Sequence, residues 1–136
     1  NQKVTKRFKE GKAAMVDINP TVCEFLGMEV PQQVRWERDG IPFYGKPEKI
    51  RDLDVINYDR EVILHWTAVK KNAQVSVYAA PANEYKTTGK ENWIHLGDIK
   101  AGEEEFRYDL DKIGDSKLYK FVVTSDHVSL NRWLVL

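Results

Sequence analysis

Residues 62–66 read Val-Ile-Leu-His-Trp, so that Val62, Leu64 and Trp66 fall on one face of an extended chain. Side chains along a β-strand point alternately to opposite faces, and a period of two therefore predicts a half-buried strand. The same pattern recurs further along, between clusters of Gly, Asn, Asp, Lys and Ser. Its apolar members are Val75, Val77 and Ala79; Ile94 and Leu96; Phe106, Tyr108 and Leu110; Tyr119, Phe121 and Val123; and Trp133 and Val135.

These segments are short, rich in Val, Ile, Tyr, Phe and Trp, and follow one another at intervals of roughly ten residues. From residue 46 onward the sequence carries no helical stripe of the i, i+3, i+4, i+7 kind between them. Strands at this spacing without intervening helices favour an antiparallel sandwich over a βαβ arrangement. We therefore predict an all-β fold in which residues 46–136 form an immunoglobulin-like antiparallel sandwich.

Residues 1–45 differ from the rest and are predicted to form an N-terminal extension. Residues 1–12 are polar and basic, and we expect them to fray or to form an edge. Residues 14–18 predict a strand that ends at Asn19-Pro20. The short apolar run at residues 22–26 predicts either a strand or one helical turn.

The strongest local hairpin pattern of the chain lies at residues 34–44. Asp39-Gly40 in its middle suits the two central positions of a type I′ turn. An isolated two-stranded hairpin is marginal in water, so we expect residues 14–44 to pack on the sandwich, with the joint at residues 44–47. A neighbouring domain could instead cover this surface. An unchanged melting temperature in a soluble fragment lacking residues 1–44 would show that the extension is separate.

The composition suits one domain with a short structured extension. The chain has 136 residues, of which 42% are apolar and 11% aromatic, enough for a core and unlike a disordered chain. Its 21 basic and 21 acidic residues cancel, so charge provides no general attraction to nucleic acid or to an anionic membrane. No run approaches the ~20 apolar residues of a membrane helix, and we expect no membrane span.

Cysteine and histidine offer no convincing chemical site. Cys23 is the only cysteine, which excludes an intramolecular disulfide, and no Cys/His spacing typical of zinc surrounds it. We interpret Cys23 as a small buried apolar residue. His65 and His95 lie on the strand faces opposite the core pattern and His127 in a turn, so all three are interpreted as solvated or edge-capping.

Two acidic stretches are also interpreted as structural. Residues 109–115 begin like a calcium loop, but Ile113 and Lys120 stand where oxygen ligands are required. The glutamates at residues 103–105 point in alternating directions and cannot form the two-carboxylate cleft of a glycosidase. We therefore predict no catalytic residue, no metal site and no cofactor.

Several features of the expected sandwich resemble those of a fibronectin type III domain. Lys46-Pro47 matches the Pro-rich segment before the first strand, and residues 62–66 match the second strand with its core tryptophan. Tyr78 matches the third-strand tyrosine. Ile113 and Tyr119 fit the spacing of the tyrosine corner, which implies that the Tyr119 hydroxyl reaches a backbone group near residues 110–113.

The sequence departs from this family at two positions. The family usually has leucine where Ile113 stands, and the bulky Trp133 in the final strand is unexpected. Ordinary immunoglobulin-like sandwiches and the N-terminal sandwich of purple acid phosphatases therefore stay open as alternatives.

The resemblance implies a non-catalytic spacer or protein-docking module of a bacterial protein that is secreted, periplasmic or displayed at the cell surface. In bacteria such modules are commonly attached to secreted glycan-degrading enzymes, so the expected partner is a protein or glycan surface. The chain begins at Asn1 without an initiator methionine, which fits a processed chain or a domain of a longer protein. The oligomeric state and the ligand are not predicted.

Four aromatic residues are the candidate binding residues. Trp93 follows the polar loop of residues 82–92, which contains Tyr85, so these two rings could be exposed together. Trp36 and Tyr44 lie on the expected hairpin. Exposed aromatic rings mark binding surfaces, so a carbohydrate-binding module accessory to a glycan-degrading enzyme is the alternative function. A further alternative is a small enzyme with a site at the junction of extension and sandwich. Packing between extension and sandwich would be another use of the same rings.

Overall fold

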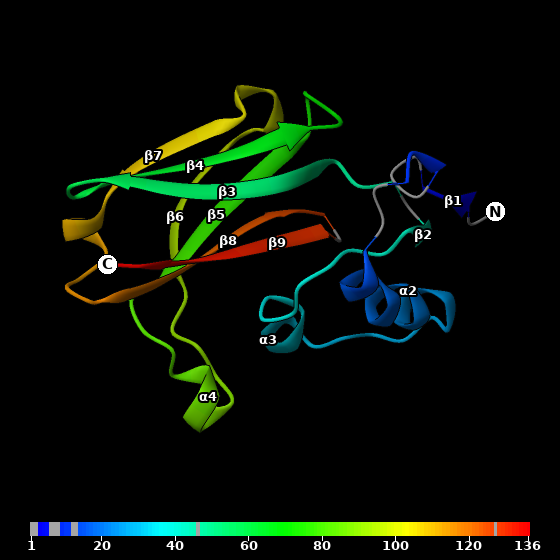
Figure 1. Ribbon diagram of the computed structural model, residues 1–136, viewed down its shortest axis with the longest axis horizontal. Coiled ribbons are helices and arrows are strands. Elements are labelled where there is room, and N and C mark those ends of the chain that lie inside the picture. Colours follow the sequence, from blue (N-terminus) through cyan, green and yellow to red (C-terminus); the bar gives the residue numbers. More distant parts are fainter. Residues whose placement is uncertain (1–2, 6–8, 12–13, 46, 127) are drawn as a thin grey trace. The chain divides into compact units, whose positions relative to one another are not determined.

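A computed structural model describes the chain apart from residues 1–2, 6–8, 12–13, 46 and 127 (Figure 1). The chain divides into two compact units, Asn1–Glu48 and Lys49–Leu136.

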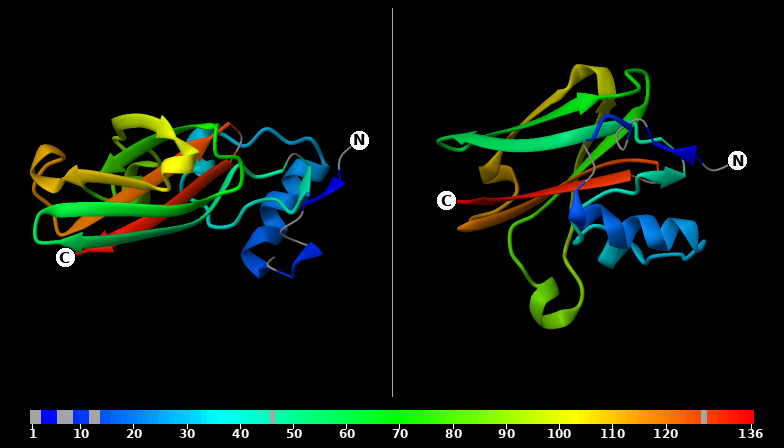
Figure 2. Two further views of the ribbon diagram at one scale, coloured as in Figure 1. Left: turned by 90° about the horizontal axis from the view of Figure 1, so that it is seen from above. Right: turned by 45° about the vertical axis from the view of Figure 1, so that its right-hand side comes forward.

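The second unit is an antiparallel β-sandwich, which confirms the all-β prediction (Figures 1 and 2). One sheet has the strand order β3-β4-β7 and the other β6-β5-β8-β9. The strands are β3 (Ile50–Tyr58), β4 (Glu61–Ala68), β5 (Gln74–Ala80), β6 (Ile94–Lys100), β7 (Glu105–Asp109), β8 (Leu118–Ser125) and β9 (Val128–Val135). Short helical turns connect some of them: α4 (Tyr85–Thr88), η2 (Ala101–Glu103) and η3 (Leu110–Lys112).

The core of the sandwich contains the side chains that the alternation selected on β4, β5 and β8. On β9 the prediction was wrong, because Trp133 and Val135 are exposed and Leu134 between them is buried. Trp66 on β4 is fully buried, as are Val77 on β5 and Tyr119 and Phe121 on β8. The Trp66 indole N–H donates a hydrogen bond of 2.9 Å to the carbonyl of Ala101. Burial of Trp66 confirms the strand register predicted for residues 62–66.

Strand β3 lacks a clear sequence pattern because a bulge interrupts its alternation. The pairing of β3 with β4 shifts register between Arg51 and Asp54, and Asp52 has a φ of 58°. An extra residue at a bulge moves the later side chains to the other face. Ile50 and Leu53 are consequently both buried although they stand three positions apart.

Tyr119 fixes the turn that precedes β8. Its hydroxyl donates a hydrogen bond of 2.6 Å to the carbonyl of Gly114 and accepts one of 3.1 Å from the amide of Ser116. Arg60 Nη2 also donates to this hydroxyl, at 3.4 Å. The hydroxyl therefore reaches the upstream backbone, one residue beyond the range expected from the tyrosine-corner spacing.

Replacing Tyr119 with phenylalanine is expected to lower the free energy of unfolding by about 1–3 kcal/mol, because buried backbone groups lose their partner. Chemical denaturation measures the change. Tyr58→Phe, at an exposed position on β3, is the control and should leave the midpoint unchanged. Equal stabilities of the Tyr119→Phe variant and the wild type would contradict a structural role for the hydroxyl.

The regular structure of the first unit is mostly helical, which corrects the strand and hairpin predictions. Residues 14–18, predicted as a strand, contribute to a 3-10 turn and a helix, and the expected hairpin at residues 34–44 is absent. Instead, the edge strands β1 and β2 pair with each other. The elements are β1 (Lys3–Val4), η1 (Met15–Asp17), α2 (Ile18–Phe25), α3 (Gln32–Arg35) and β2 (Tyr44–Gly45).

Local chemistry explains both corrections. Pro20 lies in the first turn of α2, where its missing N–H is not needed, so Asn19-Pro20 permits a helix there. Gly40 does adopt a positive φ of 87°, but a Cβ at this position would lie 2.2 Å from the carbonyl oxygen of Val16. The glycine thus serves a close backbone approach and not a hairpin turn.

Asp17 and Thr21 occupy the backbone groups that a hairpin would have used. The buried Asp17 carboxylate accepts hydrogen bonds from the amides of Ala14 (2.7 Å) and Ile41 (2.9 Å). The Thr21 hydroxyl donates to the Asp17 carbonyl at 2.6 Å and accepts from the amide of Phe43 at 3.0 Å. These bonds join η1 and α2 to the extended segment that leads into β2.

The Asp17→Ala variant is expected to lose about 2–4 kcal/mol of stability, because two backbone amides lose a charged acceptor. Hydrogen exchange should accelerate at the amide of Ile41 in particular. The exposed Asp39 provides a matched control, since Asp39→Ala removes the same charge two residues from Ile41. Equal protection of Ile41 in both variants would be inconsistent with this role of Asp17.

Candidate functional site

The most unusual feature of the second unit is an aromatic cluster around the ammonium group of Lys120. The Lys120 Nζ lies 5.8 Å from the ring centroid of Tyr85, 5.6 Å from that of Trp93 and 5.4 Å from that of Trp133. It also forms an ion pair of 2.8 Å with Glu91. The side chains of Lys120 and Glu91 are only 1% and 2% exposed. These five residues are called the Lys120 cluster.

The strand pairing and one long loop assemble the Lys120 cluster. Lys120 follows the core residue Tyr119 on β8, and successive side chains alternate, so Lys120 faces away from the core. Trp133 stands directly opposite Lys120 in the β8–β9 register. The other three members come from residues 81–93, which connect β5 to β6 and include α4 (Figure 1).

Glu91 connects this loop internally as well as to the sheet. Its carboxylate accepts hydrogen bonds from the amides of Glu84 (3.2 Å) and Tyr85 (3.3 Å), at the start of α4. The same carboxylate accepts the Lys120 ammonium, whose second acceptor is the Asn83 side-chain oxygen at 3.4 Å. One carboxylate thus joins the first turn of α4 to a central strand.

Burial of the Lys120–Glu91 ion pair costs free energy of desolvation. Removing two charges from water costs several kcal/mol per ion, which close pairing and additional hydrogen bonds must offset. Lysine is among the residues least often fully buried unless paired. Aromatic faces attract an ammonium group, most strongly where water is excluded. The three rings and the Glu91 carboxylate together supply the stabilisation that burial of Lys120 requires.

The four predicted binding residues belong to two different units. Tyr85 and Trp93 both lie at the Lys120 ammonium, whereas Trp36 and Tyr44 belong to the first unit. Trp36 is buried, and the Tyr44 ring lies 5.4 Å from that of Phe25. Trp133, which is 49% exposed, was not among the predicted binding residues. Only the β8–β9 register, which places it opposite Lys120, identifies it.

The first unit carries an exposed apolar surface along α2. Met15, Ile18, Val22, Phe25 and Leu26 are between 48% and 84% exposed, and their spacing of three or four residues places them on one side of the helical segment. A shallow cavity of about 290 Å³ lies beside them, lined by Val4, Thr21, Val22, Phe25, Leu26, Phe43 and Tyr44. The five exposed residues are called the α2 face.

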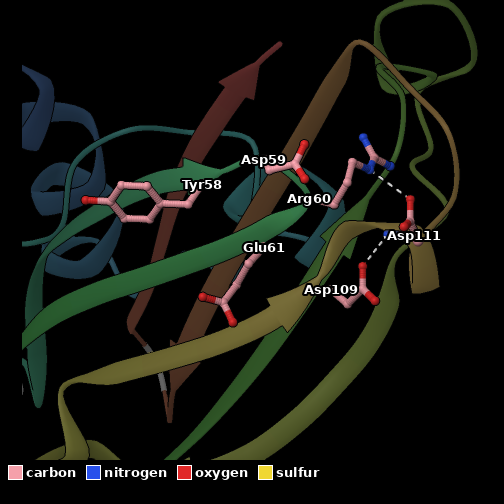
Figure 3. A pocket seen from close by; sticks show the side chains of 6 residues that line it. All are labelled: Tyr58, Asp59, Arg60, Glu61, Asp109 and Asp111. Carbon is pink, nitrogen blue, oxygen red and sulfur yellow. Dashed lines mark hydrogen bonds and ion pairs between the residues drawn. The ribbon is translucent and has the colours of Figure 1, made fainter.

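A cavity of about 450 Å³ lies at the turn between β3 and β4, next to the end of β7 (Figure 3). It is lined by Tyr58, Asp59, Arg60, Glu61, Asp109 and Asp111. Arg60 Nε pairs with Asp111 at 2.8 Å, and the Asp109 carboxylate accepts the amide of Asp111 at 2.9 Å. The Tyr119 hydroxyl and Asp111 raise the pKa of Arg60 above its ordinary value.

Three carboxylates of this cavity therefore have structural partners. Asp109 caps η3, Asp111 holds Arg60, and Glu61 pairs with Arg107 Nη1 at 3.0 Å. Among the described residues, no group of three or more His, Cys, Asp or Glu side chains is placed to hold a metal ion.

Where the structure describes them, the histidines and Cys23 are exposed or half-buried and belong to no group that could hold a metal ion. His65 is exposed, and His127 lies outside the described residues. His95 Nε2 lies 2.9 Å from Asp98, whose pKa is lowered first by the Ser76 hydroxyl and then by His95. Cys23 is half-buried on α2, which corrects the prediction of a buried residue, because α2 is a largely exposed helix in which Pro20 is the one buried residue.

No family model and no curated protein matches the sequence. Among solved structures, pectate lyase Pel3 from Pectobacterium carotovorum has a TM-score of 0.42 and 17% identity, over 64% of this chain and 26% of that chain. Pectate lyase PelI from Erwinia chrysanthemi, in complex with tetragalacturonic acid, has a TM-score of 0.41 and 13% identity, over 64% and 27%. The chain spans about a quarter of the length of these enzymes. Within the described ranges, no helix has the length and apolar character needed to cross a membrane.

Proposed function

We propose that this chain is a non-catalytic docking module that binds an apolar segment of a partner protein through the α2 face. The observation that carries the proposal is the exposure of Met15, Ile18, Val22, Phe25 and Leu26 along one helical segment. Contiguous exposed apolar residues of this kind are typical of protein-binding surfaces. A glycan requires converging polar groups for its hydroxyls, and the apolar side chains of the α2 face do not provide them.

We further propose that the sandwich is a fibronectin type III-like module that serves as the scaffold. The hydrogen bonds of Tyr119 with Gly114 and Ser116 support this assignment. The strand order supports it as well, because the fourth strand of the sandwich, β6, pairs with β5. In a constant-type immunoglobulin domain the fourth strand joins the other sheet. The corresponding location is secreted, periplasmic or at the cell surface of a bacterium.

Site-specific photocrosslinking tests the docking function. A photoreactive amino acid replaces Val22 on the α2 face, and Asp39 in a control protein, with both expressed in the native host. We expect one discrete protein adduct from position 22 and none from position 39. Excess unlabelled wild-type chain should compete for this adduct, whereas a Phe25→Glu chain should not. Absence of a discrete adduct, or equal competition by both chains, would contradict the proposal.

Carbohydrate binding is the second candidate, and the half-exposed Trp133 beside Tyr85 and Trp93 favours it. A sugar could stack on the outer side of these rings and hydrogen-bond to neighbouring polar groups. A glycan array separates the two functions. Carbohydrate binding predicts a signal that Trp133→Ala removes and Phe25→Glu leaves intact, whereas an array without signal would exclude it for the glycans displayed.

A further inference from the structure

We propose that Lys120 is the internal ligand of an alkylammonium cage, and that its binding there fixes the loop of residues 81–93 to the four-stranded sheet. The proposal concerns the second unit alone and does not depend on the docking function of the α2 face.

The chemistry of the cage is that of ammonium recognition. Three ring centroids lie 5.4–5.8 Å from the Nζ atom, within the range of cation–π attraction, and a carboxylate oxygen lies at 2.8 Å. An exposed surface ion pair would leave the lysine flexible and hydrated, as most are. Here the side chain is almost completely enclosed. The rings therefore contribute to recognition of the cation and do not merely lie near it.

The cage residues come partly from the sheet and partly from the loop, so the Lys120 contact holds the loop to the sheet; this contact is called the latch. Lys120 and Trp133 are fixed by the pairing of β8 with β9. Tyr85, Glu91 and Trp93 all belong to the loop. The ammonium group consequently joins the loop to the sheet through three of its side chains at once. Because Glu91 also accepts the first amides of α4, loss of the cation would loosen the loop internally as well.

Removal of the Lys120 ammonium from the cage would change the surface beside the loop. The faces of Tyr85 and Trp93 that meet the ammonium would become accessible, and the loop would lose its link to β8. Lys120 thereby controls whether these rings are available to an external ligand. An alkylammonium ion is the external ligand that the emptied cage would accept, because it reproduces the group that Lys120 places there.

Chemical rescue in the full chain tests the proposal. Lys120→Ala removes three methylenes and the ammonium group. The free ion n-propylammonium supplies the same number of carbon atoms and the same ammonium group. Hydrogen exchange of residues 83–92 is expected to accelerate by about tenfold in Lys120→Ala. It should return toward the wild-type rate with n-propylammonium and not with n-propanol, its neutral analogue. Lys117→Ala, at an exposed lysine three residues away, should neither accelerate exchange nor respond to either compound.

Two results would overturn the proposal: unchanged exchange in Lys120→Ala, or equal rescue by n-propanol and n-propylammonium. If Lys120→Ala does not fold, NMR of the wild-type chain provides the decision. The Lys120 Hε protons should be shifted upfield by the three rings, relative to those of Lys117. Hε shifts equal to those of Lys117 would exclude the cage.

Discussion

Trp66→Ala is expected to destabilise the sandwich by about 3–5 kcal/mol, which is the range for truncation of a large buried aromatic residue. Trp66 is fully buried, so the variant leaves a cavity between the sheets that the surrounding strands fill only in part. It also removes the indole donor from the carbonyl of Ala101, which is itself buried. Since small domains are stable by only about 5–15 kcal/mol, the melting temperature should fall sharply.

Two further variants identify the cause of this loss. Trp66→Phe keeps an aromatic ring but lacks the indole N–H, so it should lose less stability than Trp66→Ala. Tyr58→Ala removes a ring that is 68% exposed on the adjacent strand and should change stability by no more than about 0.5 kcal/mol. A Trp66→Ala protein with a melting temperature near that of the wild type would rule out the core position of this side chain.

Alternating apolar residues predicted strands of the sandwich for a physical reason. Wherever one strand face is buried and the other is more exposed, alternation reports burial directly, as it does along β5. Strand β8 is buried on both faces, because Lys120 and Val122 are covered as well as Tyr119 and Phe121. At β3 the bulge at Asp52 breaks the period, so no alternation pattern was available. On β9 the predicted face was the wrong one, since Trp133 and Val135 are exposed and Leu134 is buried.

The extension was mispredicted because side chains there satisfy backbone groups. An Asp-Gly pair predicts a turn only when the flanking segments pair with each other. In the first unit the amides of Ile41 and Phe43 bond instead to Asp17 and Thr21, twenty or more residues earlier. Such long-range bonds from side chain to backbone leave no periodic pattern in the sequence. The position of the extension on the sandwich stays a prediction.

The Lys120 cluster shows a similar limit at the level of function. The sequence indicated that Tyr85 and Trp93 could be exposed together, because Trp93 follows the polar loop that contains Tyr85. It did not indicate that a lysine on a central strand would bind between them. A lysine in an alternating strand is usually interpreted as solvated, and Lys120 alternates with Tyr119 and Phe121 in such a strand. Only the register that places Trp133 opposite Lys120 reveals the third ring.

A double-mutant cycle on Lys120 and Glu91 should give a large, non-additive change in stability. Lys120→Met keeps most of the apolar stem but leaves the Glu91 carboxylate buried without its cation, and breaking such a pair costs about 3–5 kcal/mol. Glu91→Gln leaves the ammonium with its three rings but without a carboxylate, and removes the charged acceptor of the Glu84 and Tyr85 amides. It should therefore also destabilise the chain.

The double variant distinguishes a specific buried pair from two independent contacts. With both charges removed, no uncompensated ion is left inside, so Lys120→Met with Glu91→Gln should be clearly more stable than the sum of the single losses predicts, by about 1–3 kcal/mol. The exposed pair of Arg107 and Glu61 is the matched control and should show no resolvable coupling at physiological salt, because water screens it. Additive losses at Lys120 and Glu91 would mean that the two side chains do not depend on each other, and the energetic account of the Lys120 cluster would fail. Coupling that disappears at high salt would place the pair in solvent, contrary to its nearly complete burial.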